Sequence, residues 1–204
     1  MGASMFSKES RHLESNKIFD KQLENCIYAM GAVNFSFSAI EATINEFYKN
    51  IADNKTPPYI TDNIDGLKIK VLSELWPHLN MRKTFEMYQT ALSILINKKY
   101  TDTKKGKELY DKACDLQFLR NAVIHFEPED SLSQYKHEKI QERLEKYNIK
   151  NSVFYEKSQN PYFPDKCLGH GICEWSLKTA LDFILYFYKR LGIKELAKIY
   201  ETKP

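Results

Sequence analysis

Residues 20–52 read DKQLENCIYAMGAVNFSFSAIEATINEFYKNIA. Large apolar side chains recur there at steps of three, four and seven residues, at Leu23, Ile27, Met30, Phe37, Ile40, Ile44, Phe47 and Ile51. This spacing places them along one stripe of an α-helix. The pattern predicts a long amphipathic helix over 20–52, with Gly31 or Asn34 as the point where it could bend.

Three further regions carry helical apolar spacing. The first is weak over 67–75, broken at Pro77, and resumes over 81–96; the others are 108–126 and 172–191. The last is apolar on almost every side, which is typical of a central or interface helix. Between them we expect a surface connection at 54–63, a turn at 101–107, and a long loop over 127–171 that holds one short charged helix, 135–147.

The composition also favours helices. Only 7 Gly and 7 Pro occur in 204 residues, too few for a sandwich or barrel with a turn every ~8–12 residues. We therefore expect an all-α fold, a bundle of four to six helices with a long loop before the last long helix. Residues 16–204 should form a single domain and residues 1–15 a flexible N-terminus, whose first residues, MGAS, we read as a candidate remnant of an expression tag.

Charge and hydropathy exclude two classes of protein. With 30 Lys plus Arg against 27 Asp plus Glu, the formal charge is +3, too balanced to hold duplex DNA by charge alone. No run of about 18 apolar residues predicts a membrane span, and the first residues lack the apolar stretch of a signal peptide. We expect no membrane association, a cytoplasmic location, and reduced thiols at the four cysteines.

Polar residues interrupt the apolar end of the 108–126 helix, which reads LQFLRNAVIHF over 116–126. Arg120, Asn121 and His125 are the exceptions. Because Pro128 disfavours helical geometry at the preceding residue, the helix should end near His125. An unpaired buried polar group costs on the order of 1–3 kcal/mol, so these side chains should reach partners or face a cleft.

The spacing of these three residues has chemical consequences. Asn121 and His125 share a helix face, whereas Arg120 points about 140° away from His125. The two converge if the Arg side chain folds over, or if two copies of this helix end meet, which predicts a homodimer. Carbonyls at a helix end favour a protonated imidazole, and a guanidinium binds phosphate oxygens without a metal. Together they suit RNA cleavage, with Asn121 orienting.

The run Arg120-Asn121-Ala122-Val123-Ile124-His125 resembles the signature of the HEPN superfamily, an Arg followed after four to six residues by a His, with a polar residue typically next to the Arg. The resemblance covers about 20–191. It implies an all-helical domain with metal-independent endoribonuclease activity on single-stranded RNA. In that reaction the 2′-hydroxyl attacks the adjacent phosphate and leaves a 2′,3′-cyclic phosphate and a 5′-hydroxyl.

The same resemblance implies that Arg120 and His125 are catalytic and that a homodimer builds the cleft. It implies a toxin or a phage-defence effector, with a nucleotidyltransferase-type antitoxin or another defence protein as partner, and no cofactor. The alternative function is a non-catalytic HEPN-like binding or dimerisation module, in which Arg120 caps nearby carbonyls and His125 bonds a loop.

Other residues are secondary candidates. Lys104, Lys105 and Lys107 precede the motif helix and are candidates to hold the RNA backbone, although such runs are usually solvated faces. Tyr155, Tyr162 and Phe163 could stack bases, with packing as the more common role of such residues. Glu41 and Glu46 could orient Arg120 or His125, although no motif locates them.

Cys167-Leu-Gly-His170-Gly-Ile-Cys173 offers three candidate zinc ligands within seven residues. Structural zinc usually takes four ligands, and this spacing is not a standard one. The sequence therefore predicts no metal site here, but a loop that enters the last long helix.

Overall fold

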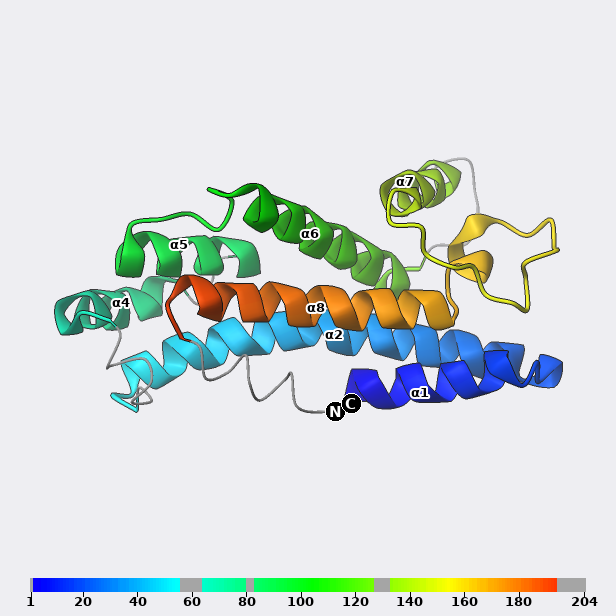
Figure 1. Ribbon diagram of the computed structural model, residues 1–204, viewed down its shortest axis with the longest axis horizontal. Coiled ribbons are helices and arrows are strands. Elements are labelled where there is room, and N and C mark those ends of the chain that lie inside the picture. Colours follow the sequence, from blue (N-terminus) through cyan, green and yellow to red (C-terminus); the bar gives the residue numbers. More distant parts are fainter. Residues whose placement is uncertain (1, 56–63, 80–82, 127–132, 194–204) are drawn as a thin grey trace. The chain divides into compact units, whose positions relative to one another are not determined.

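The computed structural model describes residues 2–55, 64–79, 83–126 and 133–193. Its elements, drawn in Figure 1, are α1 (Gly2–Ser15), η1 (Phe19–Lys21), α2 (Gln22–Ala52), α4 (Gly66–Leu79), α5 (Thr84–Ile96), α6 (Lys104–Ile124), α7 (Ser133–Glu145), η2 (Tyr162–Lys166) and α8 (His170–Arg190). No strand occurs in these ranges, which confirms the all-α class. The described ranges hold seven α-helices, more than the four to six expected.

Two helix boundaries differ from the sequence prediction. The helix expected to break at Pro77 continues to Leu79, because a proline in the last turn removes only one hydrogen bond at the end of the helix. The turn expected over 101–107 is shorter, since α6 begins at Lys104. The Thr103 hydroxyl accepts a hydrogen bond from the Gly106 amide at 3.0 Å, which satisfies one of the free N–H groups at this helix start.

The chain divides into two compact units, where we had expected one domain over 16–204. The first holds 1–38 and 112–180, and the second holds 39–111 and 181–204. Each unit is built from two stretches of the chain. The helices α2, α6 and α8 each contribute residues to both.

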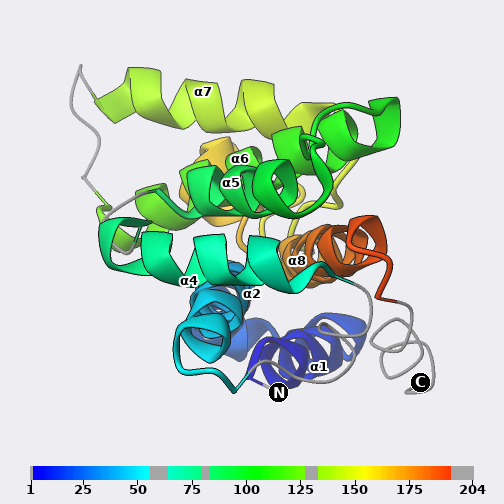
Figure 2. The same cartoon turned by 90° about the vertical axis from the view of Figure 1, so that its left-hand side faces the viewer.

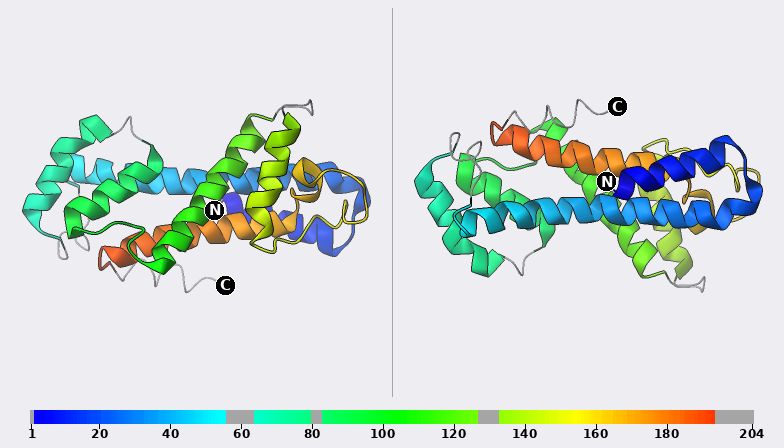
Figure 3. Two further views of the ribbon diagram at one scale, coloured as in Figure 1. Left: turned by 90° about the horizontal axis from the view of Figure 1, so that it is seen from above. Right: turned by 90° about the horizontal axis from the view of Figure 1, so that it is seen from below.

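In the first unit, α1 lies antiparallel to the first half of α2, as Figure 3 shows. The Phe6 ring lies 6.0 Å from that of Tyr28 and 5.7 Å from that of Phe35. We expected a flexible segment over 1–15, whereas residues 2–15 form helix α1. Helix α1 buries Ala3, Ser7, Ser10 and Leu13. Because most of these residues are small or polar, they gave no apolar pattern to detect.

The second unit has an aromatic core in which buried tyrosine hydroxyls donate to backbone carbonyls. The Tyr48 hydroxyl donates to the Met87 carbonyl at 2.9 Å, and the Tyr100 hydroxyl donates to the Phe183 carbonyl at 2.8 Å. The Tyr100 ring also stacks on Phe183, with centroids 4.4 Å apart. Helices α4 and α5 lie side by side in this unit (Figure 2). Burial raises the pKa of Tyr100 far above its ordinary value.

Candidate active site

The three motif residues lie at the C-terminal end of α6, in the first unit. Helix α6 ends at Ile124, and the His125 amide still donates to the Asn121 carbonyl at 2.9 Å. The prediction that this helix ends near His125 is confirmed. Asn121 and His125 are exposed, and Arg120 is half-buried, so all three can be reached from solvent.

Asn121 and Phe37 both contact the Arg120 side chain. Its Nη1 donates to the Asn121 side-chain oxygen at 3.1 Å. Its guanidinium carbon lies 5.7 Å from the centre of the Phe37 ring of α2, within the range of a cation–π contact. Phe37 is fully buried, so its ring is a fixed support. The orienting role of Asn121 in catalysis stays a prediction. The sequence had indicated only a core role for Phe37.

His125 is the first residue after α6 and is flanked by exposed apolar side chains. Ile124 is 46% exposed and Phe126 is 48% exposed. The imidazole therefore belongs to a surface that combines a titratable group with apolar neighbours. Such a surface suits a ligand that carries both a charge and an apolar ring, or a second protein chain.

Behind Phe126 lie two buried rings from distant parts of the chain. The His137 ring of α7 is nearly parallel to Phe126, at 15° and 6.0 Å between centroids, and the Phe163 ring of η2 lies 6.2 Å away. His137 and Phe163 also contact each other at 5.1 Å. Phe163 is 1% exposed, so of its two predicted roles, base stacking and packing, the structure supports packing.

Helix α7 is held on α6 by a buried carboxylate. Asp115 accepts a hydrogen bond from the Tyr147 hydroxyl at 2.7 Å and pairs with Arg143 at 3.1 Å and Lys146 at 2.8 Å. Its side chain is 7% exposed. A buried carboxylate needs such partners because removing a charge from water is costly. This cluster fixes the helix that carries His137.

The three candidate lysines lie in the second unit, at the start of α6, whereas the motif lies at the end of this helix. Lys104, Lys105 and Lys107 are exposed in the first turn of α6, and Lys107 pairs with Asp111 at 3.1 Å. Their predicted contact with RNA stays a prediction. Glu41 is half-buried and Glu46 exposed; both belong to the second unit.

The predicted loop before α8 does enter that helix, but its His and Cys residues have separate surroundings. The Nε2 atom of His170 accepts a hydrogen bond from Arg11 Nε at 3.2 Å. Burial raises the pKa of both the Cys167 and Cys173 thiols to about 12. Within the described residues, no group of three or more His, Cys, Asp or Glu is arranged to hold a metal ion.

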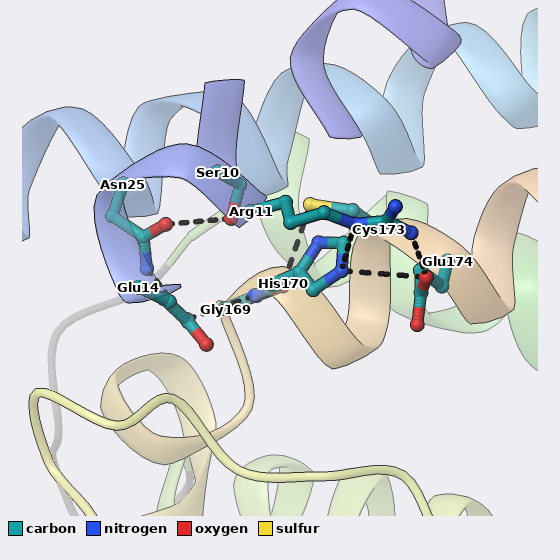
Figure 4. Close-up of polar contacts among 8 residues, drawn as sticks. All are labelled: Ser10, Arg11, Glu14, Asn25, Gly169, His170, Cys173 and Glu174. Atoms are coloured by element: carbon teal, nitrogen blue, oxygen red, sulfur yellow. Dashed lines mark hydrogen bonds and ion pairs between the residues drawn. The ribbon is translucent and has the colours of Figure 1, made fainter. Parts of the chain in front are cut away.

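Figure 4 shows that His170 belongs to a polar cluster that joins α1 to α2 and α8. The side chain of Asn25 accepts from the Ser10 hydroxyl at 2.6 Å and donates to the Glu14 carboxylate at 3.0 Å. Glu14 also accepts from the His170 amide at 2.9 Å. At the outer edge, Arg11 pairs with Glu174 at 2.5 Å. These bonds explain why α1 is ordered against its unit, and we assign the cluster a structural role.

No protein-family model matches this sequence, and neither the curated proteins nor the solved structures contain a significant match. Among the described residues, no helix combines the length and the apolar character needed to cross a lipid bilayer.

Proposed function

We propose that this chain is a HEPN-type endoribonuclease that cleaves single-stranded RNA without a metal. The proposal is carried by one observation. Arg120 and His125 stand five residues apart in the motif spacing at the solvent-accessible end of α6, with Arg120 held by Asn121 and by the Phe37 ring. A held guanidinium can stabilise charge on a phosphate and an exposed imidazole can transfer protons, and metal-free phosphoryl transfer uses both services.

The proposed reaction is an internal transesterification. The RNA 2′-oxygen bonds to the neighbouring phosphorus, and the bond from phosphorus to the 5′-oxygen breaks. The 2′-hydroxyl loses its proton and the departing 5′-oxygen gains one, so no water is consumed. His125 serves as general acid or base, and Arg120 stabilises the negative charge that builds on the phosphate oxygens. The products are a 2′,3′-cyclic phosphate and a 5′-hydroxyl.

We propose that a homodimer completes the site. One imidazole cannot remove the first proton and supply the second in a single step, so a second copy that contributes its own Arg and His would provide both groups. The exposed Ile124 next to His125 offers apolar surface for such a contact.

The resemblance further suggests a cytoplasmic toxin or phage-defence effector, restrained by a nucleotidyltransferase-type antitoxin or another defence protein. A reading frame of that kind next to the gene would support this role.

The test is RNA cleavage in the presence of a chelator. The wild type should release 2′,3′-cyclic phosphate ends from a single-stranded RNA, and His125→Ala should reduce the rate by about 100-fold or more. Arg120→Ala should reduce the cleavage rate by a similar factor, since loss of one such stabilising group lowers kcat by about 10²–10³. His78→Ala is the matched control, because His78 is also exposed in the last turn of a helix, α4.

A second candidate function is a non-catalytic binding or dimerisation module. The contacts of Arg120 with Asn121 and Phe37 favour it, because they also suit a purely structural Arg. The same experiment separates the two. Equal cleavage by the wild type and by folded His125→Ala would point to a contaminating nuclease and would leave the binding module as the better explanation.

A further inference from the structure

Phe126 is an exposed aromatic residue directly after the proposed catalytic His. It is 48% exposed, although a fully buried Phe side chain contributes about 1.5–3 kcal/mol to stability. Its neighbours Phe163 and His137 are buried, with only 1% and 8% of their surface exposed. The chain therefore holds an aromatic cluster whose outermost ring stays open to solvent beside His125.

The open ring has a rigid backing. His137 lies nearly parallel to it, at 15°, and Phe163 contacts both rings. The Asp115 cluster holds the helix that carries His137. A ring supported in this way loses little conformational freedom when a flat ligand stacks on it, so binding is less costly than it is for a free side chain.

The position of Phe126 limits what that ligand can be. Consecutive Cα atoms are about 3.8 Å apart, so a phosphate at His125 and a base at Phe126 would come from the same or an adjoining nucleotide. Aromatic side chains bind nucleobases by stacking. We propose that Phe126, backed by His137 and Phe163, stacks the nucleobase next to the scissile phosphate; this inference rests on the proposed function.

The proposal defines the substrate more closely. A base can stack on Phe126 only if it has left its neighbours in the strand, so the cleaved position should lie in an unpaired loop or end. Stacking tolerates every base, because each has an aromatic face. We therefore expect weak base preference, little cleavage within a duplex, and strong dependence on the presence of a base.

The experiment removes the base and the ring separately. After the cut position in a short single-stranded RNA is mapped, an abasic ribose replaces the nucleotide next to the cut and leaves the phosphate and the 2′-hydroxyl in place. Wild-type kcat/KM should fall at least about fivefold on the abasic RNA. Phe126→Ala should cleave the intact RNA as poorly and should not distinguish the two substrates. Phe126→Tyr and Phe126→Trp should restore the discrimination, and Phe126→Leu should not.

A matched control separates stacking from general loss of apolar surface. Phe35 is 54% exposed and also contacts a neighbouring ring, Phe6, so Phe35→Leu should keep the wild-type discrimination. If Phe126→Ala still distinguishes intact from abasic RNA as the wild type does, the stacking proposal is overturned while the nuclease proposal stands. An effect of Phe126→Ala on dimer mass alone, with unchanged discrimination, would assign the ring to the dimer contact and would also overturn it.

If the wild type cleaves no RNA, the nuclease proposal fails and binding decides the role of Phe126. The probe is then a labelled single-stranded RNA, measured by fluorescence anisotropy. Weaker binding by Phe126→Ala, but not by Phe35→Leu, would retain Phe126 as a base-binding residue. Equal binding by all three proteins would remove it.

Discussion

Adding one methyl group at Gly106 should destabilise the second unit, although Gly to Ala in a helix is normally favourable. Gly106 lies in the first turn of α6 and is buried. A Cβ atom there would stand 2.0 Å from the Tyr100 carbonyl oxygen and 2.9 Å from the Tyr186 hydroxyl. Real Cβ contacts essentially never fall below 3.0 Å, so the carbonyl and the helix would have to separate by about 1 Å.

Tyr100 is poorly placed to make that movement. Its side chain is fully buried, and its hydroxyl donates to the Phe183 carbonyl. Its backbone amide is also held, because it donates to the Gln89 side chain at 2.7 Å. Overpacking of this kind costs about 1–3 kcal/mol or more, and the helix preference for Ala returns at most about 1 kcal/mol. We therefore expect Gly106→Ala to lower the free energy of unfolding by about 2 kcal/mol.

The matched control is Gly66→Ala. Gly66 is also in the first turn of a helix, α4, but a Cβ atom there meets nothing within 4 Å. Substitution should therefore stabilise by about 0.4–1 kcal/mol through the unfolded state. Urea unfolding and thermal melting followed by circular dichroism measure both variants. If Gly106→Ala matched or exceeded the stability of Gly66→Ala, the close approach of the Tyr100 carbonyl would be refuted.

Three further changes test other parts of the structure. Asn25→Ala removes the centre of the α1 cluster and should cost about 2–3 kcal/mol, against less than about 0.5 kcal/mol for the exposed Asn45→Ala; chemical unfolding compares them. Asp115→Ala should lower the free energy of unfolding by about 2–3 kcal/mol, since it removes the hydrogen bonds that this buried carboxylate accepts, and should speed hydrogen exchange in α7. Asp111→Ala removes a half-exposed ion pair and should have neither effect. Burial raises the pKa of the Cys167 thiol from 9.0 to about 12. The thiol therefore loses its proton at a lower pH in the unfolded chain than in the folded one, so the free energy of unfolding should fall as the pH rises from 9.0 to about 12. This fall should be steeper for the wild type than for Cys167→Ala.

The helices that follow apolar periodicity were predictable from the sequence, and those that depend on distant partners were not. The end of α6 follows from the run of apolar residues before Pro128, and α8 from its continuous apolar surface. Helix α1 shows the opposite case, since its buried Ser10 is satisfied by Asn25 of another helix. A hydrogen bond of that kind leaves no periodic trace, because neither residue is apolar.

The candidate site likewise contains residues that the sequence identified and one that it did not. The spacing from Arg120 to His125 identifies the residues that could do chemistry, because reactive groups are rare in an apolar helix end. It does not identify Phe37, which supports Arg120, since a core Phe and a Phe beneath a guanidinium look the same in a sequence. The partners of a site are fixed by packing between segments, and only the structure supplies that packing.

Burial also decides which aromatic residue of this cluster can bind a base. Phe163 was a candidate for base stacking because it lies in a long loop, yet it is buried and its ring backs Phe126. The sequence did not single out Phe126, because it stands at the end of the predicted apolar helix 108–126, where a core role is the usual one. A base can reach only a ring with solvent on one side, and a ring can hold a base firmly only if the other side is packed. Within this aromatic cluster, Phe126 is the residue that combines half-exposure with two buried ring neighbours next to His125, and for that reason the proposed stacking role belongs to it and not to Phe163.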